Sequence, residues 1–306
     1  MCGVVGLLLH DPELEPRLGE LLVPMIEALD ERGPDSSGIA VYTEPPGGTD
    51  QADGAPALLR LSLGADVEVD WIAVGCGLLD LCGTGADLQR FGAGLVVDVP
   101  EDTLPDAHAL LAAQWPQVRV LGTGTNVRVL KDTGRPADTC ARYGIRRWEG
   151  YLAVAHTRMA TESAVTLLHS HPFVPARDLC VVHNGSFSNY ATVRRRLEDD
   201  GVSFDSDNDS EVAARFLASR LEFGDDLEEA TRWVMKEMDG FFTLVIADTE
   251  GMSVARDAFA CKPAVVAETP AYVAVASEYR ALAELPGIGD AIVFEPNPEE
   301  VYSWSR

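Results

Sequence analysis

Residues 1–9 have the sequence MCGVVGLLL. The run from Gly3 to Leu9 contains only apolar residues and glycine, which predicts a short strand buried on both faces. A thiol stands directly before this strand, at Cys2. If Met1 is removed, Cys2 also carries a free α-amine, which can act as the general base for its own thiol. The alternative is a buried strand that happens to start with an inert cysteine.

The sequence that follows predicts a helix, a turn and a second strand. Residues 14–30 carry leucine, methionine and isoleucine at helical spacing, which is typical of an amphipathic helix. The turn sequence RGPDSSG occupies residues 32–38, and a strand is expected at 39–42. Residues 44–56 are rich in Gly and Pro and predict a loop. Short apolar runs and Gly-rich turns continue to residue 150, so we interpret about 44–150 as an α+β insertion.

Regular periodicity returns after the insertion. Helices and strands are expected in separate groups, with short turns between the strands, which favours antiparallel sheets over βαβ crossovers. Strands are expected at 151–156 and 179–182, helices at 189–200, 208–222 and 226–238, and further strands at 241–247, 252–255, 264–266 and 272–275.

Composition excludes several classes of protein. The chain has 306 residues, of which 49 are Asp or Glu and 24 are Lys or Arg, giving a net charge of −25. Such a surface repels nucleic acid and anionic lipid, and no apolar run is long enough for a membrane-spanning helix. The six cysteines are scattered without a CxxC pair, and the sequence contains no secretory signal. These features predict a cytoplasmic, reduced protein.

Four histidines between positions 156 and 183 suggest a metal site as one interpretation. On a strand, His169 and His171 would point to the same face. However, no Asp, Glu or Cys at close spacing completes a ligand set. We therefore predict no metal site and no bound cofactor.

The segments around these histidines supply other chemistry. Arg158 ends one predicted strand, and its guanidinium can bind a carboxylate through two hydrogen bonds. Asn184 and Gly185 end another, where a side-chain amide and a backbone N–H can stabilise an oxyanion. Asp209 lies at the start of a predicted helix and can bind an ammonium group. Together with a nucleophilic Cys2, these groups are what cleavage of the side-chain amide of a free amino acid requires.

Six motifs, in their order along the chain, resemble those of the class II glutamine amidotransferases, which are N-terminal-nucleophile hydrolases. The motifs are MCGVVG at 1–6, RGPDSSG at 32–38, HTR at 156–158, SHP at 170–172, HNG at 183–185 and DSE at 209–211. The resemblance implies a four-layer αββα sandwich of the α+β class. It also implies one amidotransferase domain at 2–306, interrupted by the insertion at about 44–150.

The resemblance also implies residue roles. Cys2 would be the nucleophile after loss of Met1, and Asn184 with the Gly185 N–H would form the oxyanion hole. The substrate-binding residues would be Arg32 beside the nucleophile, Arg158 on the α-carboxylate of glutamine, Thr161 through its backbone, and Asp209 on the α-ammonium.

Within the family, the runs MATESAV at 159–165 and CVVHNGS at 180–186 are most similar to stand-alone, glutamate-synthase-like subunits, such as the amidotransferase subunit of N-methylglutamate synthase. This resemblance implies hydrolysis of L-glutamine to glutamate and ammonia. The ammonia would pass to a separate, flavin-dependent synthase subunit. The insertion is a candidate docking surface for that subunit, or a solvated elaboration of the fold. Two alternatives stay open, namely a partner-independent hydrolase of γ-glutamyl amides and a non-catalytic regulatory subunit.

Overall fold

The computed structural model describes residues 2–45, 57–83, 87–160 and 164–306. Their strands form three sheets, and every strand pairing within these sheets is antiparallel, as predicted. Within these ranges, no helix combines the length and the apolar character that crossing a bilayer requires.

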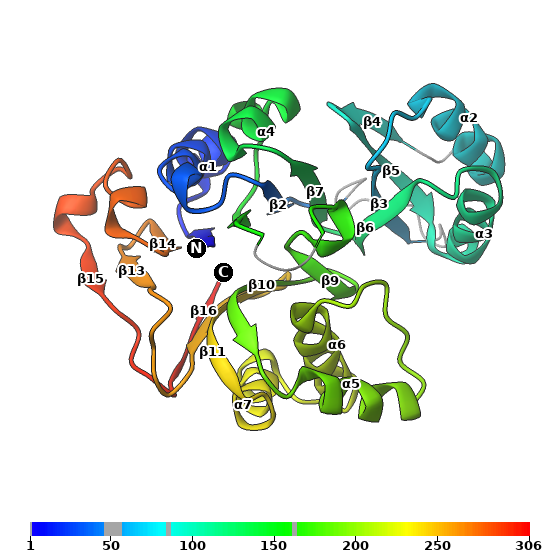
Figure 1. The fold of residues 1–306 in the computed structure, drawn as a ribbon. Coiled ribbons are helices and arrows are strands. Elements are labelled where there is room, and N and C mark those ends of the chain that lie inside the picture. The colour runs from blue at the N-terminus through cyan, green and yellow to red at the C-terminus, as the bar shows by residue number, and fades with distance from the viewer. Residues whose placement is uncertain (1, 46–56, 84–86, 161–163) are drawn as a thin grey trace.

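The two larger sheets form the centre of the molecule (Figure 1). The seven-stranded sheet has the order β15 (Ile292–Phe294), β13 (Val265–Glu268), β14 (Tyr272–Ala276), β1 (Gly3–Leu9), β8 (Leu152–Arg158), β2 (Ser36–Tyr42) and β7 (Val127–Thr133). The five-stranded sheet has the order β16 (Val301–Ser305), β12 (Gly251–Arg256), β11 (Gly240–Ala247), β10 (Leu179–Phe187) and β9 (Phe173–Ala176).

Helices cover the outer faces of both sheets, which gives four layers (Figure 1). Helices α1 (Leu18–Glu27) and α4 (Pro136–Tyr143) pack on the seven-stranded sheet. Helices α5 (Tyr190–Asp199), α6 (Asp209–Glu222) and α7 (Leu227–Glu237) pack on the five-stranded sheet. A third apolar core lies between the two sheets. The predicted αββα sandwich is therefore confirmed.

Strand β1 is buried along its whole length, as its apolar sequence predicts. Alternate side chains on a strand point to opposite faces. Val5 and Leu7 accordingly join the core beneath α1, whereas Val4 and Leu8 join the core between the sheets. A one-residue shift of register would exchange these two sets of side chains between the two cores. The apolar run therefore fixes the register of β1 and places Cys2 at the end of the sheet where β1 begins.

The predicted insertion divides between two parts of the fold. A four-stranded sheet of its own has the order β4 (Leu88–Phe91), β5 (Gly94–Pro100), β3 (Leu58–Gly64) and β6 (Arg119–Gly124), with α2 (Trp71–Cys82) and α3 (Leu104–Gln114) packed on it. In contrast, β7 pairs with β2 in the central sheet, and α4 packs beside α1. Residues 127–143 therefore belong structurally to the sandwich, because the apolar side chains of β7 complete its edge.

Candidate active site

Three strands bring the predicted site residues to one end of the sandwich, where β1 begins and β8 and β10 finish. Strand β1 pairs with β8 so that Gly3 lies opposite Thr157, which puts Cys2 next to Arg158. Strand β10, which carries Asn184, packs against both β1 and β8 from the other sheet. Residues far apart in the sequence therefore meet where β1 begins and β8 and β10 end.

Cys2 is held by its backbone and is partly exposed. Arg32 donates from Nε to the Cys2 carbonyl oxygen at 3.0 Å, and from Nη1 to Glu278 Oε1 at 2.6 Å. The start of β1 is also held by Ser277, whose hydroxyl accepts a hydrogen bond from the N–H of Val4 at 2.9 Å. The thiol itself lies 3.9 Å from the carbonyl oxygen of Met159. This arrangement fixes the backbone at Cys2 and leaves its side chain at the surface of the site.

Arg158 ends β8 and is buried except for 5% of its surface. Its Nη1 donates to the Ala164 carbonyl oxygen at 3.0 Å. Burial lowers the pKa of the Arg158 guanidinium, and the neighbouring Cys2 and Asp35 oppose that shift. A guanidinium remains charged despite such a shift, so Arg158 supplies a positive charge beside the thiol.

The turn after Arg32 packs directly on the end of β8. A Cβ on Gly33 would lie 2.3 Å from the Thr157 carbonyl carbon, so only glycine allows this close approach. Asp35 then donates its N–H to the Arg158 carbonyl oxygen and accepts from the Ala160 N–H at 2.7 Å. The turn thereby holds the chain on both sides of Arg158.

Asn184 and Gly185 supply two hydrogen-bond donors near the end of β10. Asn184 is 3% exposed, and its Nδ2 has no hydrogen-bond partner among the described residues. A Cβ on Gly185 would lie 2.0 Å from the Phe241 carbonyl oxygen across the strand pair. A buried donor without a partner is costly, and such a donor is what an oxyanion would satisfy.

Asp209 is the first residue of α6, but it does not cap the helix. Asn208 is the N-cap, because its side chain accepts from the N–H of Ser210 at 2.9 Å. The Asp209 carboxylate instead accepts from the Phe187 N–H at 2.8 Å and from the Ser210 hydroxyl at 3.1 Å. These contacts tie the carboxylate to the end of β10.

Three of the four histidines form a buried cluster behind the site. The ring centroids of His156 and His171 are 4.2 Å apart, and those of His171 and His183 are 6.2 Å apart. Burial lowers the pKa of His156 to about 3 and that of His183 to about 4, and it lowers the pKa of His171 well below the ordinary value. The rings are therefore neutral, and their contacts join the ends of β8 and β10.

Ser210 bridges His183 and Asp209. The Ser210 oxygen lies 2.7 Å from His183 Nδ1 and 3.1 Å from the Asp209 carboxylate, within hydrogen-bond distance of both. His169 lies apart and bonds to Asp207. In the described parts of the chain, no group of three His, Cys, Asp or Glu side chains could hold a metal.

The structure thus gathers Cys2, Arg158, Asn184, Gly185 and Asp209 at one edge, with Arg32 behind the nucleophile. Thr161 lies outside the described residues. Sequence reasoning assigned no role to Ser210, Ser277 or Glu278, the residues that hold Asp209, β1 and Arg32. Ser210 lies within the DSE motif at 209–211, but a place in a motif does not reveal a residue's hydrogen-bond partners.

Comparison with known proteins extends over the whole chain. Residues 156–284 match the glutamine amidotransferase domain family. The glutamine amidotransferase-like protein GlxB of Rhizobium meliloti (strain 1021) is 44% identical over 306 residues, which are 100% of this chain and 99% of that protein. Glutamine–fructose-6-phosphate aminotransferase (isomerizing) of Zymomonas mobilis is 40% identical over 97 residues, covering 32% of this chain and 16% of that enzyme.

The fold is also found among solved structures. Glutamine phosphoribosylpyrophosphate amidotransferase from B. subtilis aligns with a TM-score of 0.60 over 99% of this chain and 49% of that one. The two are 17% identical in sequence, so this similarity concerns the fold alone.

Proposed function

Because this chain belongs to the class II glutamine amidotransferases, we propose that it hydrolyses L-glutamine to glutamate and ammonia through a γ-glutamyl thioester on Cys2. The Cys2 sulfur attacks the side-chain amide carbon, and negative charge develops on the amide oxygen. The Asn184 amide and the Gly185 N–H stabilise that oxyanion. The α-amine of Cys2, exposed after loss of Met1, takes the thiol proton and gives it to the departing ammonia.

A second half-reaction completes the cycle. Water loses a proton to the same amine and attacks the thioester carbon. The C–S bond breaks, the amine returns the proton to the Cys2 sulfur, and glutamate leaves. Arg158 binds the α-carboxylate of the substrate, and Asp209 binds its α-ammonium. Both groups contact non-reacting parts of glutamine, so they select the substrate and orient it.

The observation that carries this proposal is the buried Asn184 amide, whose Nδ2 has no hydrogen-bond partner among the residues that the structure describes. Burying a donor without a hydrogen bond has a cost, which active sites accept when a transition state supplies the missing acceptor. Asp209, which accepts a hydrogen bond from the Phe187 N–H at the end of the same strand, supports an amino acid as the substrate.

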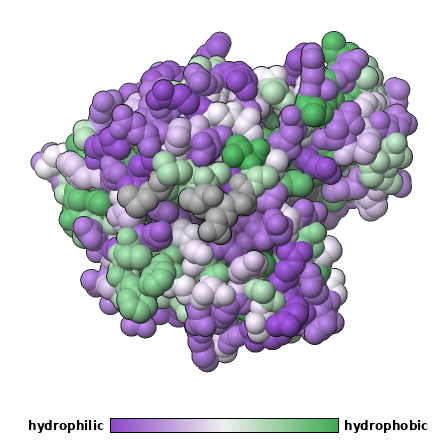
Figure 2. All heavy atoms as spheres, viewed as in Figure 1, coloured by the Kyte–Doolittle hydropathy of each residue, from purple (hydrophilic) through white to green (hydrophobic). Residues whose placement is uncertain are grey.

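We further infer that the ammonia passes to a separate synthase subunit, of the flavin-dependent glutamate-synthase or N-methylglutamate-synthase type. Large apolar side chains around the site support a partner. Phe241, whose carbonyl oxygen faces Gly185, is 48% exposed. Its ring lies 5.2 Å from that of Phe259, which is 73% exposed. Met159, beside Cys2, is 38% exposed. Apolar patches interrupt a mostly hydrophilic face of the molecule (Figure 2), and such patches mark interaction sites.

The six free cysteines support a cytoplasmic setting.

The test is the mass of the intact protein before and after treatment with 6-diazo-5-oxo-L-norleucine, an electrophilic mimic of glutamine. We expect a chain without Met1 that gains one adduct, mapped to Cys2 by peptide analysis. Cys76 and Cys261 are also exposed, so Cys2→Ser and Cys261→Ser variants provide matched controls. Labelling that persists in Cys2→Ser, or a retained Met1 with no adduct, would contradict the proposal and favour a non-catalytic subunit.

A further inference from the structure

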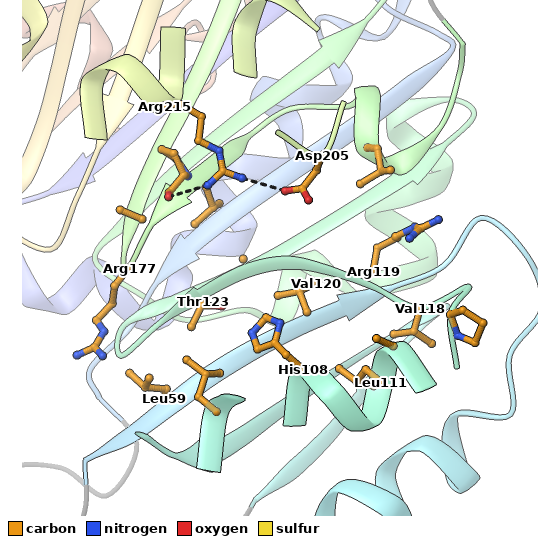
Figure 3. A pocket seen from close by; sticks show the side chains of 18 residues that line it. Leu59, His108, Leu111, Val118, Arg119, Val120, Thr123, Arg177, Asp205 and Arg215 are labelled. Carbon is orange, nitrogen blue, oxygen red and sulfur yellow. Dashed lines mark hydrogen bonds and ion pairs between the residues drawn. The ribbon is translucent and has the colours of Figure 1, made fainter. Parts of the chain in front are cut away.

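A large groove separates the inserted sheet from the sandwich (Figure 3). Its volume is about 780 Å³, within the range of small-molecule sites. Strands β3 and β6 and helix α3 line one side, and β9, Arg177 and α6 line the other. None of the described residues proposed to act on glutamine lines it.

The groove reverses the charge of the surrounding protein. Arg119, Arg177 and Arg215 line it from both sides, together with His108 on α3 (Figure 3). Asp205 is the one carboxylate among its described lining residues. The whole chain, in contrast, has twice as many acidic as basic residues. The described lining residues therefore carry three guanidiniums against one carboxylate.

Two of these cations are already engaged. Arg215 donates to Asp205 at 2.9 Å and to the Pro175 carbonyl oxygen at 3.3 Å, and Arg177 pairs with Glu101. The side chain of Arg119 is exposed, and its guanidinium makes no hydrogen bond or ion pair with any residue that the structure describes. Its guanidinium is therefore available to a ligand.

A buried lysine lines a smaller cavity that shares residues with the groove. A side cavity of about 50 Å³ shares Val174, Asp205 and Arg215 with the groove and is lined by Lys131. Lys131 is 6% exposed, forms no ion pair within the described parts of the chain, and holds its Nζ 5.1 Å from the centre of the Phe173 ring. Burial lowers its pKa to about 8, so it is still mostly protonated at neutral pH.

Neighbouring carboxylates are committed elsewhere. Both oxygens of Glu211 accept from the backbone N–H groups of Asp205 and Ser206, and Glu211 also pairs with Arg215. The Asp205 carboxylate pairs with Arg215 as well. A buried charge without a dedicated partner is costly. An anion entering from the groove would remove that cost.

We propose that this groove binds a small organic acid, with its carboxylate toward Lys131 and Arg119 and its apolar body against the aliphatic walls. Apolar side chains on both sides of the groove support the placement of the acid's apolar body there. They include Leu59, Leu111, Val118, Val120, Leu168 and Val174. The site is independent of glutamine hydrolysis, so its test requires no catalytic activity.

The experiment is isothermal titration calorimetry of the intact protein with hexanoate at neutral pH. The uncharged hexanamide and inorganic phosphate serve as comparison probes. Hexanoate is expected to bind, and both comparison probes are expected to bind at least about tenfold more weakly. Phosphate binding without hexanoate binding would overturn the claim that the groove holds an apolar body. Equal binding of hexanamide would overturn the claim that Lys131 and Arg119 bind a carboxylate.

Variants locate the binding. Lys131→Met keeps the length of the side chain without its charge, and it should weaken hexanoate binding by about tenfold or more, the size of a charge-assisted hydrogen bond. Arg119→Gln tests the exposed cation and poses little risk to folding. Arg195→Gln, on the exposed face of α5 and outside the groove, is the matched control. Hexanoate affinity that is unchanged in both groove variants would overturn the proposal, as would the absence of binding to the wild type.

Discussion

At the scale of single residues, Asn184 allows an effect on catalysis to be distinguished from an effect on stability. Its Nδ2 is buried and makes no hydrogen bond with any residue that the structure describes. Its proposed contact forms only when an oxyanion develops. Removing this amide should therefore change the rate of reaction but not the stability of the fold.

We expect Asn184→Ala to lower kcat for glutamine hydrolysis by about 10²–10³, the usual effect of losing one oxyanion donor. KM should change little, because the contact belongs to the transition state. Steady-state kinetics on the wild type and the variant measure both constants, and thermal unfolding checks that the midpoint is retained. A variant that keeps its kcat within about twofold would exclude Asn184 from the oxyanion hole.

At the scale of elements, the turn at residues 32–38 fastens the edge of the central sheet. Gly33 approaches β8 more closely than a side chain permits, and Asp35 bonds on both sides of Arg158. The turn thus couples the position of Arg32, which holds Cys2, to the position of Arg158. A larger residue at position 33 should loosen both.

Gly33→Ala should destabilise the protein by about 1–3 kcal/mol, the typical cost of overpacking, as measured by urea unfolding. It should also raise KM for glutamine, because Arg158 would shift. Gly289→Ala is the matched control, because a Cβ there meets nothing within 4 Å, and it should change stability by less than about 0.5 kcal/mol. Equal stability of the two variants would contradict the close packing of this turn.

At the scale of the whole molecule, the histidine cluster joins the two sheets. His156 lies on β8, His183 lies on β10, and His171 lies between them. An unfolded histidine titrates near pH 6.5, whereas burial lowers the pKa of His156 to about 3 and of His183 to about 4. The unfolded chain therefore binds protons that the folded chain does not bind between these values.

The free energy of unfolding should consequently fall as the pH drops below about 6.5, and the contribution of the neutral rings should be lost toward pH 4 and below. Denaturant unfolding between pH 7 and pH 5 measures the slope. His171→Gln removes one titrating ring and should reduce the slope by up to about 1.4 kcal/mol per pH unit. Identical slopes for wild type and His171→Gln would contradict a neutral, buried His171.

Much of the fold was predictable because its signals are local. The apolar run at 3–9, the helices after 189 and the paired strands after 240 each carry their own periodicity, and the ordered motifs indicated the αββα sandwich. The segment 44–150 was harder to divide. Strand β7 and the insertion strands have the same apolar sequence pattern, and only pairing with β2 places β7 in the sandwich.

The sequence by itself determined which chemical groups this protein carries: a thiol at Cys2, a guanidinium at Arg158, an amide at Asn184 and a carboxylate at Asp209. Tertiary structure alone decided their partners. That Ser210 ties Asp209 to His183, and that Lys131 is buried beside a groove, depends on how distant elements pack. The reason is physical: periodicity records which face of an element is apolar, whereas hydrogen bonds and desolvation arise only when separate elements meet.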